Sequence, residues 1–244
     1  MDVARSLEDE WFSRHSATAF QKTNALGYAT MEVRFGLRGT PRRFDHHSLL
    51  EAARGATVRT TGWPFGFFSD NDNKPKPQKD GIVAQVEANF MGCSLDYWAI
   101  RTTGDFYLLR TLFEDKHDPV GKFLYYNARI WQTAEALLYC KSLYTRLGLD
   151  AGTVDFRLAH HGTKGRRIAH SNPEQRIYSS IPPNLSHDDA SETDVSFEHP
   201  ITAENIARTV QAMLDPLFVT FDFFKPGEEM YREIVEAFLQ GRCL

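Results

Sequence analysis

The chain has 244 residues, of which 42% are hydrophobic and 25% are charged, as in an ordinary globular protein with one core. Its 28 Lys and Arg residues are outnumbered by 32 Asp and Glu residues, so the formal net charge is −4. This balance excludes a global positive field that would attract the chain to nucleic acid or to a membrane surface. Any such binding must depend on a local patch.

Hydrophobic periodicity in the first half of the chain predicts helices and a series of strands. In chain order these are a helix over 6–24, a strand over 28–37, a helix from an N-cap at Asp45 to 53 closed by Gly55, a broken strand over 58–68, and strands over 81–90, 94–101 and 105–113. The polar segment 69–81 is the clearest loop. The TTGD motif predicts a hairpin, and the strand after it is apolar on both faces, which indicates a central position in a covered sheet.

The second half begins with the longest periodic segment, 119–148, for which Gly148 is the expected C-cap. The remaining elements are a strand over 153–161, a return strand over 166–171 that would make the intervening loop a hairpin tip, a flexible linker over 179–192, a short strand over 195–200, a helix N-capped by Thr202 that could include the aromatic run 218–224, and a last amphipathic helix. The order lacks regular βαβ alternation. We therefore expect one α+β domain over 1–244, with a mixed, largely antiparallel sheet packed by a long central helix and two C-terminal helices.

The three cysteines, Cys93, Cys140 and Cys243, are odd in number and lack the spacing of metal ligands. We interpret them as reduced thiols, which indicates a cytoplasmic protein. The N-terminal residues carry early acids and no apolar segment of the signal-peptide kind. No stretch approaches the roughly 20 apolar residues of a membrane span, so we expect no membrane partner.

Residues 158–172, LAHHGTKGRRIAHSN, form a cationic segment that contains two glycines and no acidic residue. Glycines let backbone N–H groups approach an anion closely, and arginine donates paired hydrogen bonds to phosphate oxygens. The pattern predicts a contact with nucleic acid or another phosphate-bearing ligand. The candidate binding residues are Lys164, Arg166, Arg167, His160, His161 and His170. The alternative is a solvated hairpin tip, because turns commonly use Gly and Lys.

The histidines do not predict a metal site. His160 and His161 are adjacent, so on a strand they point to opposite faces, and His46 and His47 are adjacent in the same way. His170 could meet one of the first pair across a hairpin, but no acidic or cysteine ligand is near in sequence. We expect no metal and no cofactor, and structural or hydrogen-bonding roles for the histidines.

A metal-dependent nuclease is the enzymatic alternative, because Glu114, Asp115 and Lys116 form an E-x-K triplet after Asp96 on the preceding strand. A two-residue turn in the intervening hairpin would place Asp96 and Glu114 on opposite faces, whereas a three-residue loop would reverse that. Even then the two carboxylates would be roughly 10 to 13 Å apart along the strands, at about 3.3 Å per residue. The usual hydrolase and nucleotide-hydrolysis signatures are absent, so a role without catalysis is favoured.

Two further segments have a functional and an ordinary interpretation. The aromatics of GWPFGFF (62–68) could stack on bases or on a partner, although such segments more often plug the edge of a core. The linker carries four acids without a cation, which is typical of a mobile, solvated tether. Those acids are Asp188, Asp189, Glu192 and Asp194. A sharper hypothesis is that they shield the basic loop, in which case neutralising them would strengthen nucleic-acid binding at low salt.

An ordered series of segments carries a resemblance to a known family. The segments are GWPFGFF, DGIVAQVE, SLDYWAIRTTGDFYLLRTLFED, AEALLYCKSLYTRLG and LAHHGTKGR. The series, over residues 30–170, resembles the C-terminal region of bacterial proteins with an N-terminal Schlafen/Alba-like domain that is described as DNA-binding. Those proteins are often described as transcriptional regulators or ATP-binding proteins. This chain begins almost at once with the resembling region, and we expect it to lack the N-terminal domain. The resemblance therefore implies neither DNA nor nucleotide binding, and no catalytic residue.

These observations favour a non-catalytic, cytoplasmic and bacterial binding module that contacts nucleic acid or another phosphate-bearing ligand through the basic loop, within a regulatory or defence assembly. The first alternative is a protein-interaction or oligomerisation module that uses the C-terminal helices and the aromatic run 218–224. A protein partner or a homo-oligomer is expected. The second alternative is the metal-dependent nuclease with Asp96, Glu114 and Lys116.

Overall fold

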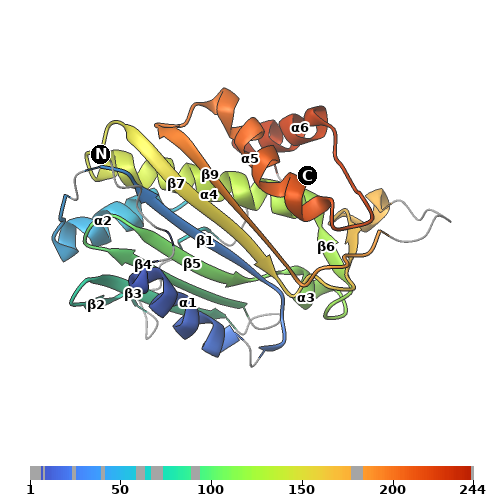
Figure 1. Cartoon of the computed structure of the whole chain (residues 1–244), viewed down its shortest axis with the longest axis horizontal. Coiled ribbons are helices and arrows are strands. Elements are labelled where there is room, and N and C mark those ends of the chain that lie inside the picture. Colours follow the sequence, from blue (N-terminus) through green and yellow to red (C-terminus); the bar gives the residue numbers. More distant parts are fainter. Residues whose placement is uncertain are drawn as a thin grey trace.

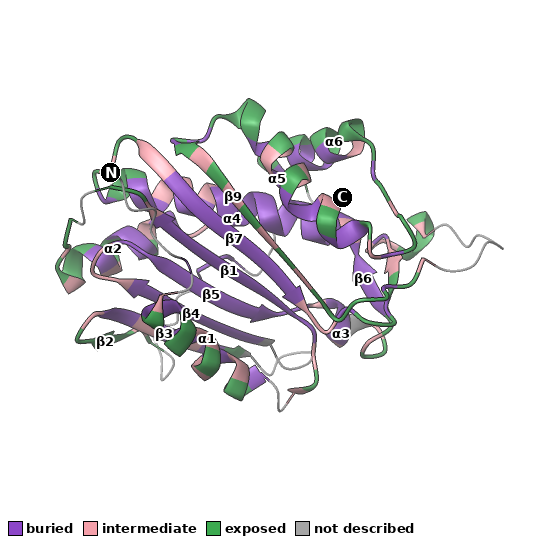
Figure 2. Cartoon of the chain, viewed as in Figure 1, coloured by how far each residue is buried: buried purple, intermediate pink, exposed green. Residues whose placement is uncertain are grey.

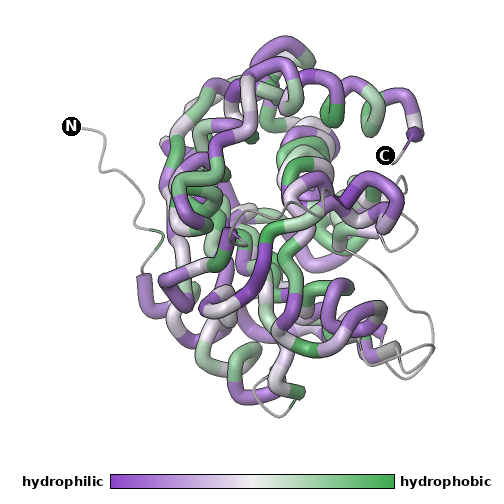
Figure 3. The backbone as a smooth tube through the Cα atoms, turned by 90° about the vertical axis from the view of Figure 1, so that its right-hand side faces the viewer, coloured by the Kyte–Doolittle hydropathy of each residue, from purple (hydrophilic) through white to green (hydrophobic). Residues whose placement is uncertain are grey.

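The computed structural model describes residues 7, 9–23, 26–39, 42–58, 64–66, 74–88, 94–176 and 184–242. Its framework is a seven-stranded sheet with helices on both faces (Figure 1). The long helix α4 (Tyr126–Arg146) crosses one face, and α1 (Glu10–Thr23) covers part of the other. In the perpendicular view of Figure 3, α4 is seen nearly along its axis beside the sheet.

Every neighbouring pair in the large sheet is antiparallel, in the order β2-β3-β4-β5-β1-β7-β9. In that order the strands span Lys76–Gln78, Gly81–Ala88, Ser94–Arg101, Phe106–Thr111, Thr30–Leu37, Gly152–His161 and Ala190–His199. A separate two-stranded sheet pairs β6 (Phe123–Tyr125) in parallel with β8 (Arg167–Ala169). The predicted α+β class with a largely antiparallel sheet is confirmed.

The remaining helices are α2 (His46–Ala56), the short α3 (Glu114–His117) and η2 (Pro173–Gln175), and the C-terminal α5 (Ala203–Phe218) and α6 (Glu228–Leu239). Asp45 caps α2 and Thr202 caps α5, as predicted, because each side chain accepts a hydrogen bond from a backbone N–H of the first turn. Among the described residues, no helix has the length and apolar character needed to cross a bilayer.

The two faces of the sheet differ in chemistry. On the α4 side, Met31, Val33 and Phe35 of β1 join the main core. On the α1 side, the same strand presents the charged side chains of Glu32 and Arg34, which are also buried. Figure 2 shows that β1, β5 and β7 are buried over most of their length, whereas β9 is largely exposed. The prediction of a central, doubly covered strand after the hairpin is confirmed for β5.

The β4–β5 hairpin turns through residues 102–104, because the Arg101 N–H donates to the Asp105 carbonyl. In this register Asp96 pairs with Arg110, and both side chains lie on the α4 side of the sheet. Of the two alternatives for this hairpin, the three-residue loop is therefore correct and the two-residue turn is wrong. The longer loop is accommodated by Gly104, whose φ of 87° is in the left-handed region.

The largest difference from the sequence-based expectation follows the basic loop. Residues 166–171 do not return antiparallel to β7; β8 instead pairs with β6, so the loop is not a hairpin tip. The antiparallel neighbour of β7 on this side is β9, which begins at Ala190, inside the predicted linker. The alternation of exposed and partly exposed residues along β9 is a strand pattern that the polar composition concealed. Residues 177–183 of the predicted linker lie outside the described residues.

Several predicted boundaries also shift. Helix α4 begins at Tyr126 instead of near 119, because 123–125 form β6. Gly55 lies within α2, and 76–78 in the predicted loop pair with β3 as an edge strand. The aromatic run 218–224 does not extend α5, which ends at Phe218 and is followed by a turn.

Candidate functional site

Three segments that are distant in sequence lie side by side at the basic loop. The Gly165 N–H donates to the Ser186 carbonyl over 2.9 Å, and the Ser186 N–H donates to the Arg166 carbonyl over 2.9 Å. The His187 N–H then reaches the carbonyl of Thr220 over 3.2 Å. We call the exposed residues of these segments, apart from Gly165 and the acids Asp188, Asp189 and Asp222, the loop surface. They are Lys164, Arg167, Leu185, His187, Val219 and Phe223.

Arg166, one of the predicted binding residues, is buried, with only 2% of its surface exposed. Its Nη1 and Nη2 donate to the two carboxylate oxygens of Asp115 over 2.8 and 2.7 Å. The same guanidinium also donates to the carbonyls of Gly162 and Phe123. Burial opposes ionisation of Asp115, but hydrogen bonds from Arg166, Gly121 and Ala29 outweigh it and hold the pKa of Asp115 below its usual value. The prediction for Arg166 is therefore corrected: it is an internal ion-pair partner and is not available to an outside anion.

The three predicted histidines point to separate places. His160 is buried on the α4 side, opposite Met31 of β1, and burial lowers its pKa well below the usual value. His161 lies on the other side of the sheet and binds Glu32. His170 is buried, and its Nδ1 accepts a hydrogen bond from the Asn172 N–H over 3.0 Å. The expected role in hydrogen bonding fits His161 and His170, and no His/Cys/Asp/Glu group of the described residues could hold a metal ion.

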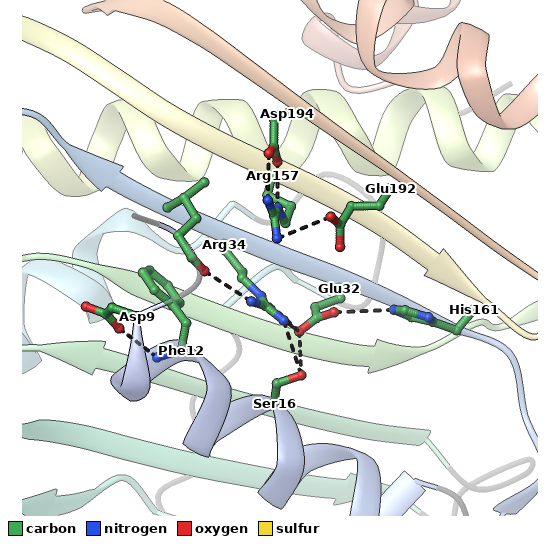
Figure 4. Close-up of polar contacts among 10 residues, drawn as sticks. Asp9, Phe12, Ser16, Glu32, Arg34, Arg157, His161, Glu192 and Asp194 are labelled. Atoms are coloured by element: carbon green, nitrogen blue, oxygen red, sulfur yellow. Dashed lines mark hydrogen bonds and ion pairs between the residues drawn. The ribbon is translucent and has the colours of Figure 1, made fainter. Parts of the chain in front are cut away.

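The carboxylate of Glu32 organises the polar network on the α1 side (Figure 4). It accepts hydrogen bonds from Ser16 Oγ at 2.9 Å and from Arg34 Nη2 at 2.9 Å, and His161 Nε2 lies 3.3 Å from its other oxygen. Burial opposes ionisation, but His161 and Arg34 outweigh it and lower the pKa of Glu32 to about 2. Ser16 and His161 bind different oxygens of one carboxylate, so their arrangement is not that of a nucleophile and its general base.

Two acids of the predicted linker belong to β9 and are paired with Arg157 of β7. Asp194 accepts two hydrogen bonds of 2.6 Å from the Arg157 guanidinium, and Glu192 lies 3.2 Å from it (Figure 4). The expectation that the acids of the linker have no cationic partner is therefore wrong for Glu192 and Asp194. The other two acids, Asp188 and Asp189, are exposed, and their backbone carbonyls accept hydrogen bonds from Thr163 in the basic loop.

Lys164 and Arg167 remain exposed and form no ion pair within the described part of the chain. In the adjoining turn after α5, Phe223 is 86% exposed. The backbone at Asp222 and Phe223 is left-handed, with φ of 50° and 61°, a conformation that costs a non-glycine residue about 1–2 kcal/mol. The Asp222 carboxylate fixes this turn by accepting from the Leu185 N–H over 2.9 Å and from His187 Nε2 over 2.7 Å.

The two carboxylates of the nuclease alternative, Asp96 and Glu114, are held by arginines. Asp96 accepts a 2.6 Å hydrogen bond from Arg110, which also lies 3.5 Å from Glu135 of α4. Glu114 is buried in α3 and accepts a 3.0 Å hydrogen bond from Arg129. Burial, the larger effect, raises the pKa of Glu114 even though Arg129 opposes the rise. Carboxylates engaged in this way do not offer the open, shared set of oxygens that a catalytic metal ion requires.

Sequence reasoning did not single out Phe223, because its signal is conformational. The run FVTFDFF predicted a helix or an interface as a whole, but Phe218 and Phe221 are buried and Phe223 is exposed. In the other predicted aromatic segment, 62–68, Phe65 packs in the core, with its ring centroid 5.0 Å from that of Tyr139. This agrees with the interpretation of the segment as part of the edge of the core. Trp63, Phe67 and Phe68 lie outside the described residues. Comparison of the chain with protein-family models, curated proteins and solved structures finds no match.

Proposed function

We propose that the chain is a non-catalytic binding module for single-stranded nucleic acid, with the loop surface as its contact. Phe223 stacks on a base, and Lys164 and Arg167 bind neighbouring phosphates. The observation that carries this proposal is the exposed Phe223 on a left-handed backbone, in a turn joined by hydrogen bonds through 185–187 to the loop with two cations that form no ion pair within the described residues. Aromatic stacking combined with cationic phosphate contacts is the usual chemistry of single-strand binding.

The conformation of the 219–224 turn supports a role in binding a ligand, in addition to any role in stabilising the fold. Exposing an aromatic ring to water is unfavourable, and the left-handed backbone at Asp222 and Phe223 adds a conformational cost. Strained residues of this kind gather at ligand sites, where their surroundings hold them in place. Here the surroundings are the hydrogen bonds of Asp222 to Leu185 and His187.

The electrostatics of the loop surface support binding that depends moderately on salt. Lys164 and Arg167 supply two phosphate contacts, whereas the exposed Asp188 and Asp189 next to the loop reduce the local positive potential. The surface also lacks the contribution of Arg166, whose charge is neutralised internally by Asp115. Because few phosphates are neutralised, the expected affinity is modest and depends on the aromatic ring as well as on charge.

A protein-interaction module is the second candidate, and a different observation favours it. Val219 and Leu185 are 48% and 36% exposed and lie on the same surface as Phe223. Aliphatic side chains add little to base stacking, but they suit an apolar contact with a partner protein.

The test is a titration of fluorescently labelled single-stranded DNA and RNA across a salt series. Replacing both Lys164 and Arg167 by Gln is expected to weaken binding about tenfold and to lower the salt slope by about 1.4. Phe223→Leu is expected to weaken binding, whereas Phe223→Trp retains it, because only the aromatic ring stacks. Arg208→Gln, which removes an exposed charge of α5 outside the loop surface, is the control.

Equal affinities for all these variants would overturn the nucleic-acid proposal. A self-associating or partner-bound protein that is dissociated by Phe223→Asp and is indifferent to the Lys164 and Arg167 substitutions would support the protein-interaction candidate. Sedimentation velocity measures this outcome independently of nucleic acid.

A further inference from the structure

A groove separate from the loop surface lies between α1 and the β2–β3 edge of the sheet, on the α1 side. It encloses about 360 Å³ and is lined by side chains of both elements and of β4. Val83 of β3 and Tyr97 of β4 contribute its apolar part. Lys22 reaches it from the last turn of α1, and Lys74 and Lys76 from the opposite wall.

Among the described residues that line the groove, the charges are all positive. Three of these eight residues are lysines, and none of the eight is Asp or Glu. Within the described part of the chain, Lys22, Lys74 and Lys76 form no ion pair. Among the described acids of adjoining segments, Asp80 pairs with Arg14, whereas Glu87 accepts a hydrogen bond from the neutral amide of Gln85 and keeps its charge.

Protection of the sheet edge accounts for only part of this pattern. Lysine and proline on an edge strand hinder pairing with another chain, which suits Lys76 and Pro77 of β2. Lys22 belongs to a helix on the other side of the groove and protects no edge. Like charges that converge from two elements repel each other, and the repulsion is relieved when an anion lies between them.

We propose that this groove binds a compact phosphate-bearing polyanion between Lys22 of α1 and Lys74 and Lys76 of the edge strand region. Lysine is suited to this task because its ammonium group is a mobile point charge with three donors, and several such groups can adjust to one multivalent anion. Gln78, which also lines the groove, adds a neutral amide donor, whereas the Gln85 amide already donates to Glu87. The half-open shape admits a small ligand from solvent without opening the fold.

Inorganic tripolyphosphate is the probe, titrated by calorimetry and by thermal unfolding at low salt. The wild-type chain is expected to bind it and to gain thermal stability, and Lys22→Gln combined with Lys76→Gln is expected to weaken binding more than about tenfold. Lys79→Gln is the matched control, because this lysine lies in the adjoining β2–β3 turn and does not line the groove. Equal weakening by the control would mean that only the general charge is sensed and would overturn the proposal.

A second measurement does not depend on affinity. Without an anion, Lys22→Gln is expected to change the unfolding temperature little, because it removes repulsion across the groove together with a favourable charge in the last turn of α1. With tripolyphosphate, wild type is expected to unfold at a higher temperature than Lys22→Gln, and a difference between the two that does not depend on the anion would contradict the site. Lys164→Gln with Arg167→Gln leaves tripolyphosphate binding intact if the groove is the site, so this result and the test of the loop surface can fail separately.

Discussion

Asp115 and Arg166, 51 positions apart in the chain, form a doubly hydrogen-bonded ion pair in the interior. Their side chains are 1% and 2% exposed. The pair joins α3 to the basic loop, and the Asp115 carboxylate also accepts from the N–H groups of Ala29 and Gly121. One arginine of the basic loop thus holds the loop in place, while its neighbour Arg167 is left at the surface.

Breaking this pair from one side is expected to be costly, because the remaining charge stays buried without its partner. We predict that Arg166→Met lowers the free energy of unfolding by about 3–5 kcal/mol. Arg167→Met, at the adjacent exposed position, should change it by less than about 0.5 kcal/mol. Urea denaturation of the two variants makes the comparison, and equal stabilities would show that the Arg166 pair adds nothing to the fold.

The pKa of Glu32 predicts a pH dependence of stability. In the folded chain this pKa is lowered to about 2 from an ordinary value of 4.5, so folding favours the ionised form. The contribution is fully present above about pH 5 and is lost as the pH falls toward 2, and it amounts to about 3 kcal/mol. We predict that the difference in unfolding free energy between wild type and Glu32→Gln shrinks over this range. A difference that stays constant from neutral pH to pH 3 would show that ionisation of Glu32 does not stabilise the fold.

The exposed acids next to the basic loop predict that two pairs of substitutions differ in their effect on nucleic-acid affinity. Under the proposed function, Asp188→Asn with Asp189→Asn strengthens nucleic-acid binding at low salt by about threefold to tenfold, because two charges near the phosphates are removed. Glu192→Gln with Asp194→Asn should not, since these carboxylates are paired with Arg157. Binding isotherms at low and high salt test both pairs, and equal gains would point to net charge alone.

The turn at Phe223 predicts a conflict between stability and binding. Phe223→Gly is expected to raise the free energy of unfolding by up to about 1 kcal/mol, because glycine adopts a φ of 61° without the steric cost of a side chain. The same variant should lose affinity for single-stranded nucleic acid. By contrast, Phe221→Ala is expected to cost about 3–5 kcal/mol, because Phe221 is fully buried. If Phe223→Gly destabilises the chain, the ring has a structural role that its exposure does not reveal.

Periodicity and caps predicted most of the fold. The alternation of β1, the continuous apolar run of β5, the caps Asp45 and Thr202 and the two last helices follow local rules that the structure obeys. The errors occur where a distant partner decides the outcome. Strand β8 pairs with β6, more than 40 residues earlier in the chain, and no local pattern in 166–171 specifies that partner.

The candidate site was less predictable than the fold, because sequence does not reveal whether a charge is already neutralised. Arg166 and Arg167 are neighbours of the same type, yet one is buried against Asp115 and the other is exposed. The exposure of Phe223 depends in turn on hydrogen bonds from Asp222 to the segment 184–187. Both outcomes are set by tertiary contacts, which composition and spacing do not encode directly.

The central position of β1 in the sheet has a consequence for folding during synthesis. This strand is made early, yet its two neighbours in the sheet are β5 and β7, so one of its edges stays open until residue 161 has been synthesised. In a nascent chain on the ribosome, β1 therefore stays unpaired along one edge until β7 has been synthesised. Pairings of such long sequence separation are slow to form, and delays in translation between the two strands should favour aggregation over productive folding.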